Sequence, residues 1–202
     1  MKRVILVHGA GIVLGSSRLF SLCKPLKDKG FAVNRFWYGS AFVLTSFVGS
    51  IFAAKRLGKI IEENDIIIGH TNGCLVADMA IKHSSTAAGT SLICLAPALD
   101  TQHVFDWRWN DITIIRSPGD YIRIAEYIPF NPCGNMMRDG ILNRRVENRE
   151  HQMTIQDITG DSKRYWHSGF LDSELFQLRF SQWLWKKYYD DIISINPQCL
   201  QN

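Results

Sequence analysis

Long apolar segments, metal-ligand cysteine patterns and a strong charge imbalance are all missing from this sequence. Met1-Lys2-Arg3 lead directly into an apolar run, and no secretory signal pattern precedes it. The longest apolar stretch, Ala41–Ala54, is shorter than the ~20 residues of a membrane-spanning helix. The five cysteines include no pair at metal-ligand spacing. We therefore expect reduced thiols, a cytoplasmic location, no membrane span and no bound metal.

The charge and composition indicate a globular chain. Lys and Arg number 23 against 19 Asp and Glu, which leaves a net charge of +4, and the basic residues are scattered. Such a small excess does not predict binding to nucleic acid. The 202 residues, of which 46% are hydrophobic, suit one domain with a buried core. We expect residues 1–202 to form a single domain, and its oligomeric state is not predicted.

Short apolar runs alternate with helical patterns along the chain. Strands are predicted at Val4–His8, Phe31–Trp37, Ile66–Gly69, Ser91–Leu95, Ile112–Arg116 and Met153–Ile158. Helices are predicted from Leu19 to Lys29-Gly30, where Pro25 should kink or shorten the helix, and at Phe42–Glu63, Asn72–His83 and Phe170–Tyr189. The alternation predicts a three-layer α/β/α sandwich around a mostly parallel sheet of about six strands. The irregular residues 121–150 are a candidate for a small lid.

The segment Ile66–Ala77 combines an apolar strand, a tight turn and a helix. Its turn, Gly69-His70-Thr71-Asn72-Gly73, has two glycines around a central hydroxyl residue. This pattern is typical of a nucleophile elbow, in which a strained central residue presents its hydroxyl at a helix N-terminus. A Cβ on either glycine is expected to collide with the neighbouring strand or helix. The usual central residue is serine, and here it is Thr71.

A hydroxyl nucleophile needs a histidine base, and the base needs an orienting carboxylate. In this topology the nucleophile, acid and histidine follow in that order along the chain. His167 lies between the last predicted strand and helix and is the predicted base. Asp120, in a Pro-Gly turn after the fifth strand, is the predicted acid. His151, Asp100 and Asp106 stay open as alternatives.

An oxyanion hole needs two preorganised N–H groups beside the nucleophile. One is expected from Asn72, and the other from Ala10 or Gly11 in the loop after the first strand. Further candidates for the substrate pocket are His8, Gly9, His70, Trp107 and Trp166. For His8 the alternative is a structural role, and for Trp107 it is simple packing.

Four segments together resemble the α/β-hydrolase superfamily: VILVHGAG at Val4–Gly11, the GHTNG elbow, RSPGD ending at Asp120, and WHSGF beginning at Trp166. The resemblance spans nearly the whole chain. It implies hydrolysis of a carboxylic ester, thioester or amide of a small-molecule acyl substrate, through an acyl-enzyme and without a cofactor. Thr71 departs from the family pattern, because its additional methyl group is bulky and stiff at χ1.

Three interpretations of Thr71 follow: a threonine hydrolase, a binding protein that keeps the site without turnover, or a threonine in place of a native serine. Two weaker alternatives concern other chemistry. The spaced glycines from Gly9 to Gly15 match a dinucleotide fingerprint, but no acidic residue follows the second strand to hold a ribose. Cys74, one turn into the helix, is the less favoured nucleophile.

Overall fold

A computed structural model describes residues 1–9, 16–38, 47–100, 102–116, 153–157 and 169–195. Within these ranges six parallel strands form one sheet in the order β2-β1-β3-β4-β5-β6. The strands are β1 (Arg3–Val7), β2 (Ala32–Phe36), β3 (Ile66–His70), β4 (Ser91–Leu95), β5 (Asp111–Arg116) and β6 (Met153–Asp157). The predicted parallel sheet is therefore confirmed, with each strand boundary within one residue of its expected position.

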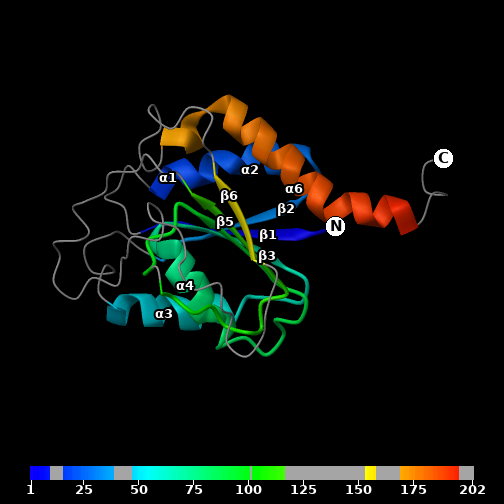
Figure 1. Cartoon of the computed structure of the whole chain (residues 1–202). Helices are drawn as coiled ribbons and strands as arrows, with labels where there is room; N and C mark the ends of the chain where they lie inside the picture. Colours follow the sequence, from blue (N-terminus) through cyan, green and yellow to red (C-terminus); the bar gives the residue numbers. More distant parts are fainter. Residues whose placement is uncertain (10–15, 39–46, 101, 117–152, 158–168, 196–202) are drawn as a thin grey trace.

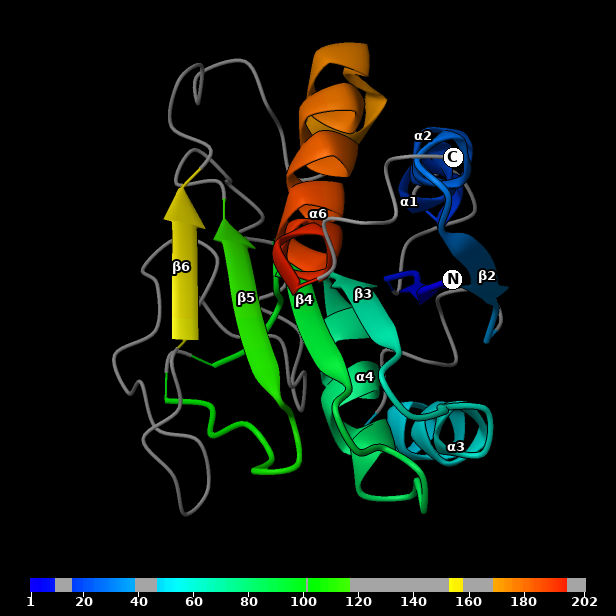
Figure 2. The ribbon, with the colours of Figure 1, turned by 90° about the vertical axis from the view of Figure 1, so that its right-hand side faces the viewer.

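Helices cover both faces of the sheet (Figure 1). Helices α1, α2 and α6 lie on one face, and α3 and α4 lie on the other, which confirms the predicted three-layer sandwich. Figure 2 shows β5 and β6 side by side and pointing the same way. The helical elements are α1 (Ser16–Leu19), η1 (Phe20–Leu22), α2 (Cys23–Asp28), α3 (Phe47–Gly58), α4 (Asn72–Ile81), η3 (Gly169–Asp172) and α6 (Glu174–Ile195).

Two apolar clusters, one on each face of the sheet, hold these layers together. The cluster under α3 and α4 includes Leu57, Val76 and Trp109, the last being fully buried. The cluster on the other face includes Leu26 of α2 and Leu184 of α6. All five residues of β3 are buried, because a central parallel strand is covered on both faces. The first residue after β3 is Thr71, so the core fixes the position of the elbow.

Two helices differ from the predicted boundaries near their glycine or proline. The first predicted helix is divided into α1, η1 and α2, and Pro25 lies in the first turn of α2, where no backbone donor is required. Helix α3 ends at Gly58 instead of Glu63. Beyond Gly58 the chain turns, with the N–H groups of Ile60 and Ile61 both donating to Leu57 O.

The last helix also differs from its prediction. The N–H of Phe176 donates to Ser173 Oγ at 3.4 Å, so Ser173 caps a new helix N-terminus after η3. Helix α6 then continues to Ile195, beyond the predicted end at Tyr189. In the described ranges, no helix has the length and apolar character needed to cross a membrane. The lid predicted for residues 121–150 lies outside the described residues.

Candidate active site

The turn between β3 and α4 has the geometry expected of a nucleophile elbow. Thr71 occupies the N-cap of α4 with φ 55° and ψ −120°. Positive φ is rare for residues other than glycine, and a β-branched side chain makes it more strained. A Cβ on Gly69 would lie 2.8 Å from Cys74 Cα, and a Cβ on Gly73 would lie 2.3 Å from Val7 O. Both flanking glycines are therefore required by close backbone contacts, one with the helix and one with β1.

Thr71 is the only accessible residue in this part of the chain. Every residue from Asp65 to His70 is buried, and so is every residue from Asn72 to Asp78. Thr71 alone between them has intermediate exposure. Its backbone is held from two sides, because its N–H donates to Leu95 O at 3.1 Å and its carbonyl accepts from Ala98 N at 3.3 Å. The elbow thus presents one strained hydroxyl at the carboxyl edge of the sheet.

The chain after β1 approaches this hydroxyl closely. A Cβ built on Gly9 would lie 2.8 Å from Thr71 Cβ and 3.2 Å from Thr71 Oγ1. Only glycine therefore allows the backbone to pass beside Thr71 at this point. Asn72 occupies the first position of α4, where a backbone N–H has no acceptor within the helix. Gly9 and Asn72 thus bring backbone from two different elements to the two sides of Thr71.

The imidazole ring of His70 contacts the Thr71 hydroxyl. Its two ring nitrogens both lie 3.3 Å from Thr71 Oγ1. Equal distances place the oxygen off the lone-pair axis of each nitrogen, and such misaligned hydrogen bonds are weak. His70 is also buried, with 4% of its surface exposed. This geometry suits an orienting contact better than proton transfer.

His8 sits in an aromatic cage at the end of β1. Its ring stacks on Tyr38 with the centroids 4.2 Å apart, and Trp37 lies 4.6 Å away. The Tyr38 N–H donates to Nε2 at 3.3 Å, so Nδ1 carries the proton and donates to Gly9 O at 2.6 Å. Burial lowers the pKa of His8 below its ordinary 6.5. A neutral ring with both nitrogens bonded to backbone fixes the Gly9 carbonyl beside the elbow.

A second strained residue lies at the same edge and was not predicted. Ala96, directly after β4, has φ 46°. Its N–H donates to Ile115 O at 2.9 Å, and the segment continues to Ala98, which bonds to Thr71. The following Pro97 marks a turn in the sequence but carries no signal for a positive φ on the residue before it. Strain of this kind concentrates at functional sites.

One of the alternative acids, Asp106, belongs to a hydrogen-bonded group toward the other end of α4. Asp78 Oδ2 accepts from His103 Nε2 at 3.0 Å, and Asp78 Oδ1 accepts from Trp109 Nε1 at 2.7 Å. Asp106, an alternative acid, is buried beside Asp78, to which its N–H donates at 3.1 Å. Asp78 is seven residues beyond Thr71, which corresponds to about 10 Å of helix. We call this group the α4 carboxylate cluster: Asp78, His103, Asp106 and Trp109.

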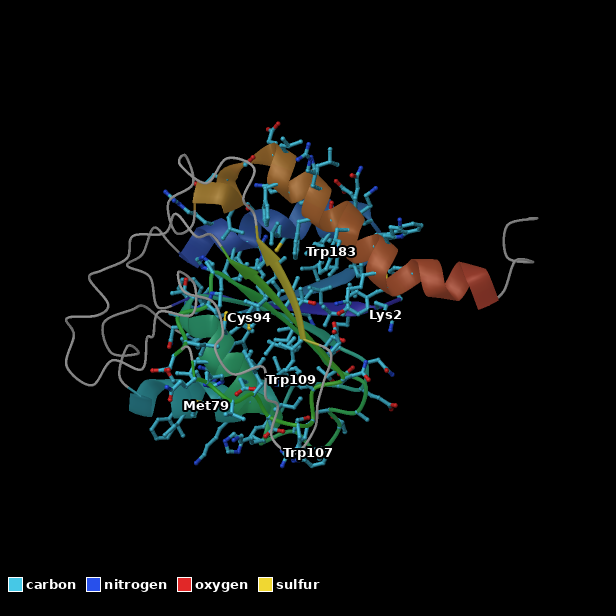
Figure 3. All side chains as sticks on the ribbon, in the orientation of Figure 1. Lys2, Met79, Cys94, Trp107, Trp109 and Trp183 are labelled. Atoms are coloured by element: carbon cyan, nitrogen blue, oxygen red, sulfur yellow. The ribbon has the colours of Figure 1, made fainter. Side chains whose placement is uncertain are left out.

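The structure places Trp107, a predicted substrate-pocket residue, away from the elbow. Its neighbour Arg108 donates to Ile81 O, the last residue of α4, and Asn110 donates to Thr90 O at the start of β4. Trp107 therefore lies at the amino edge of the sheet, about 15 Å of helix away from Thr71. Figure 3 shows Trp107 at the periphery, well separated from Cys94 on β4. The loop after β4 returns along α4 before β5 begins, and the sequence spacing does not show this return.

Cys74 is not placed as a nucleophile either. Its side chain is fully buried beneath the elbow, and its Sγ lies 3.9 Å from Leu95 O. Burial raises the pKa of the Cys94 thiol. Asp100, another alternative acid, is exposed and accepts a hydrogen bond from Gln102 N. Within the described ranges, no three His, Cys, Asp or Glu side chains form a group that could hold a metal ion.

The remaining predicted site residues lie outside the described residues: Ala10, Gly11, Asp120, His151, Trp166 and His167. Strand β5 ends at Arg116, at the same edge of the sheet as β4. After β6 the next described element is η3, where Leu171 O accepts from Ser21 Oγ at 2.8 Å and Asp172 pairs with Arg18 at 3.2 Å. These partners belong to α1 and η1, which follow the loop after β1.

No protein-family model and no curated protein sequence matches this chain. Solved structures do match it. Lipase B of Aspergillus fumigatus has a TM-score of 0.54 at 17% identity, with 87% of this chain covering half (50%) of that one. The esterase domain of a Rhodothermus marinus protein has a TM-score of 0.55 at 12% identity over 92% of this chain and 85% of that one.

Mouse α/β hydrolase domain-containing protein 10 has a TM-score of 0.54 at 12% identity, with coverage of 95% and 89%. These similarities show that the chain has the α/β-hydrolase fold. At these identities they concern the fold alone, so the chemistry is argued from this chain's own residues.

Proposed function

We propose that this chain, with its α/β-hydrolase fold, is a hydrolase of carboxylic esters that uses Thr71 as its nucleophile. The observation that carries the proposal is the strained backbone and the accessibility of Thr71. A β-branched residue is held at φ 55° and is the one accessible position between two buried runs. Such strain costs about 1–3 kcal/mol and persists where function requires it. The solved structures that match include a lipase and an esterase domain, which agrees with ester chemistry.

The proposed mechanism assigns the base to His167 and its orienting carboxylate to Asp120. His167 accepts the proton of Thr71 Oγ1 while the oxygen attacks the carbonyl carbon of the ester. The N–H groups of Asn72 and of Ala10 or Gly11 donate to the oxyanion. The alcohol leaves with the proton from His167. A water molecule, deprotonated by His167, then attacks the acyl-threonine, and His167 returns this proton to Thr71 Oγ1 as the acid is released.

The additional methyl group of Thr71 affects the turnover rate that we expect. The Thr71 Cβ lies close to Gly9, because a Cβ built on that glycine would be 2.8 Å from it. The stiff χ1 of a β-branched residue restricts Oγ1, and a displacement of ~1 Å can reduce the rate about 100-fold. We therefore expect slow turnover, and Thr71→Ser to be faster by at least about tenfold because serine has more rotamers available.

The test is turnover of p-nitrophenyl acetate and butyrate by the chain and by Thr71→Ser, Thr71→Ala and Thr86→Ala. Thr86 is an exposed threonine on another segment and is the matched control for loss of a hydroxyl. The proposal predicts activity in the first two, background rates in Thr71→Ala, and no effect of Thr86→Ala. Equal rates in all four proteins would overturn it and favour the binding-protein alternative.

A second set of variants tests the base. His167→Ala and Asp120→Asn are expected to lower kcat by about 10²–10⁴, the usual contribution of general acid–base catalysis. His70→Gln keeps a polar side chain beside Thr71 and is expected to cost less than tenfold. A larger loss in His70→Gln than in His167→Ala would transfer the role of base to His70.

A further inference from the structure

Helix α3 has two different faces. Its inner face, formed by small and apolar residues such as Ala53, Ala54 and Leu57, is buried against the sheet and α4. Its outward face is exposed and is formed by Phe52, Lys55, Arg56 and Lys59, the last directly after the helix end. At about 100° per residue these four positions fall within roughly 100° of one another on the helix. We call these four residues the α3 outer face.

The stretch of sequence that contains α3 has basic residues and no acidic ones. The stretch that begins with Lys29 and ends with Ile61 has no Asp or Glu, and it holds five Lys or Arg residues, Lys29 included. This stretch alone therefore carries more positive charge than the net +4 of the chain. In the described part of the structure, Lys55, Arg56 and Lys59 pair with no carboxylate, and Arg56 lies over the Phe36 ring at 5.8 Å. These cations are available to an external anion.

An exposed aromatic side chain accompanies the cations. Phe52, on the α3 outer face, has 64% of its surface exposed. Strand β2 is an edge strand, and Figure 2 shows β2 and α3 on the same flank of the molecule. An exposed Phe beside Lys and Arg is typical of protein surfaces that lie in the headgroup region of a bilayer.

We propose that this flank, with the α3 outer face at its centre, binds the surface of a bilayer that contains anionic phospholipids. The phosphate groups neutralise the three cations, and Phe52 inserts at the boundary between headgroups and acyl chains. The cations and the aromatic ring are displayed together on the convex surface of a helix. A fluid bilayer can contact such a surface without a matching shape, whereas an acidic protein partner needs one.

The experiment is co-sedimentation of the full chain with vesicles of phosphatidylcholine alone and of phosphatidylcholine and phosphatidylglycerol in equal parts. Binding is expected only with phosphatidylglycerol and should weaken with rising salt, because exposed charges are screened. Lys55→Glu/Lys59→Glu should weaken binding about 25-fold or more, since each cation near an anionic bilayer contributes about fivefold in affinity. Phe52→Ser should weaken binding about tenfold through the loss of a buried aromatic side chain.

The matched controls lie on α6, on the other face of the sheet. Arg179→Glu/Lys186→Glu reverses two exposed cations and gives the same net charge, and Leu175→Ser removes an apolar side chain that is 53% exposed. Both controls are expected to bind like the unmodified chain, and far-UV circular dichroism confirms that all variants are folded.

No sedimentation with either vesicle type, equal sedimentation with both, or an equal loss in the α6 controls would each overturn the proposal. Capture of an acidic protein without any vesicle binding would also overturn it. Vesicle binding does not require turnover, so this result is independent of the ester-hydrolysis test.

Discussion

The two ends of α4 carry similar polar side chains in opposite states. At its N-terminus, Thr71 is strained, partly exposed and next to an imidazole that is poorly aligned with it. Toward its C-terminus, Asp78 is buried and accepts well-directed hydrogen bonds from His103, Trp109 and the Asp106 backbone. An aspartate beside a histidine would by itself suggest catalysis. Here Asp78, which accepts three hydrogen bonds, holds a loop in place, and the strained Thr71 is the residue that we propose for chemistry.

The comparison predicts that the two ends respond differently to substitution. Groups in the α4 carboxylate cluster should contribute to stability and little to turnover. Groups at the elbow should contribute to turnover and cost stability, because strained backbone is retained at the expense of folding free energy.

The largest expected effect is on stability, from Asp78→Ala. It leaves the Trp109 indole N–H and the Asp106 N–H buried without acceptors and should lower the free energy of unfolding by about 4 kcal/mol. Chemical denaturation measures this change. Glu63→Ala, which removes an exposed carboxylate, is the control and should change the free energy by less than about 0.5 kcal/mol. Similar small changes in both would show that the cluster does not clamp the loop.

A smaller loss of stability is expected from Gly73→Ala. The new Cβ would lie 2.3 Å from Val7 O and 2.6 Å from His8 O, both backbone atoms, so the elbow or β1 must shift. We expect a loss of about 3 kcal/mol together with loss of esterase activity. Gly30→Ala separates crowding from backbone strain, because Gly30 has φ 85° and open space around it. That variant should lose about 1 kcal/mol and keep its activity.

Thr71→Gly should change stability in the opposite direction. Relief of the positive φ, about 2 kcal/mol, exceeds the entropic cost of a glycine, roughly 1 kcal/mol, so the variant should be about 1 kcal/mol more stable. It should also be inactive. Thr86→Gly removes a hydrogen bond to Ile61 O and should be destabilised instead. A destabilised Thr71→Gly would contradict the claim that strain is stored at the elbow.

The smallest effect concerns pH. Burial holds the pKa of folded His8 below 6.5, so the unfolded chain binds a proton first as the pH falls. The stability due to neutral His8 is therefore fully present above pH 6.5 and decreases as the pH falls from there through the folded pKa. His8→Gln should flatten this part of the stability–pH curve. His83→Gln, which changes an exposed histidine, is the control for the loss of an imidazole.

Most of the fold follows from the sequence, because buried parallel strands are continuous apolar runs and leave a clear pattern. The strands from Val4, Ile66, Ser91 and Ile112 all lie where the apolar runs predict them. The errors concern helix ends that depend on tertiary contacts. Gly58 ends α3 where the helix meets Ala80 O of α4, and Ser173 starts a new helix after η3.

The candidate site was predictable where the backbone dictates residue type. Gly69 and Gly73 are required by contacts shorter than 3 Å, so their spacing identifies the elbow. The misplaced Trp107 and the unexpected φ of Ala96 depend on the path of a loop, which has no period in the sequence. The assignments of Asp120 and His167 stay predictions.

The most direct test of the central claim is detection of the acyl-enzyme. The chain and Thr71→Ala are mixed with p-nitrophenyl butyrate, quenched in acid during turnover, and analysed by intact mass and peptide mapping. The account predicts one butyryl group on the peptide that contains Thr71, and none in Thr71→Ala. Turnover without this adduct, or an equal amount of adduct on other side chains in both proteins, would contradict it.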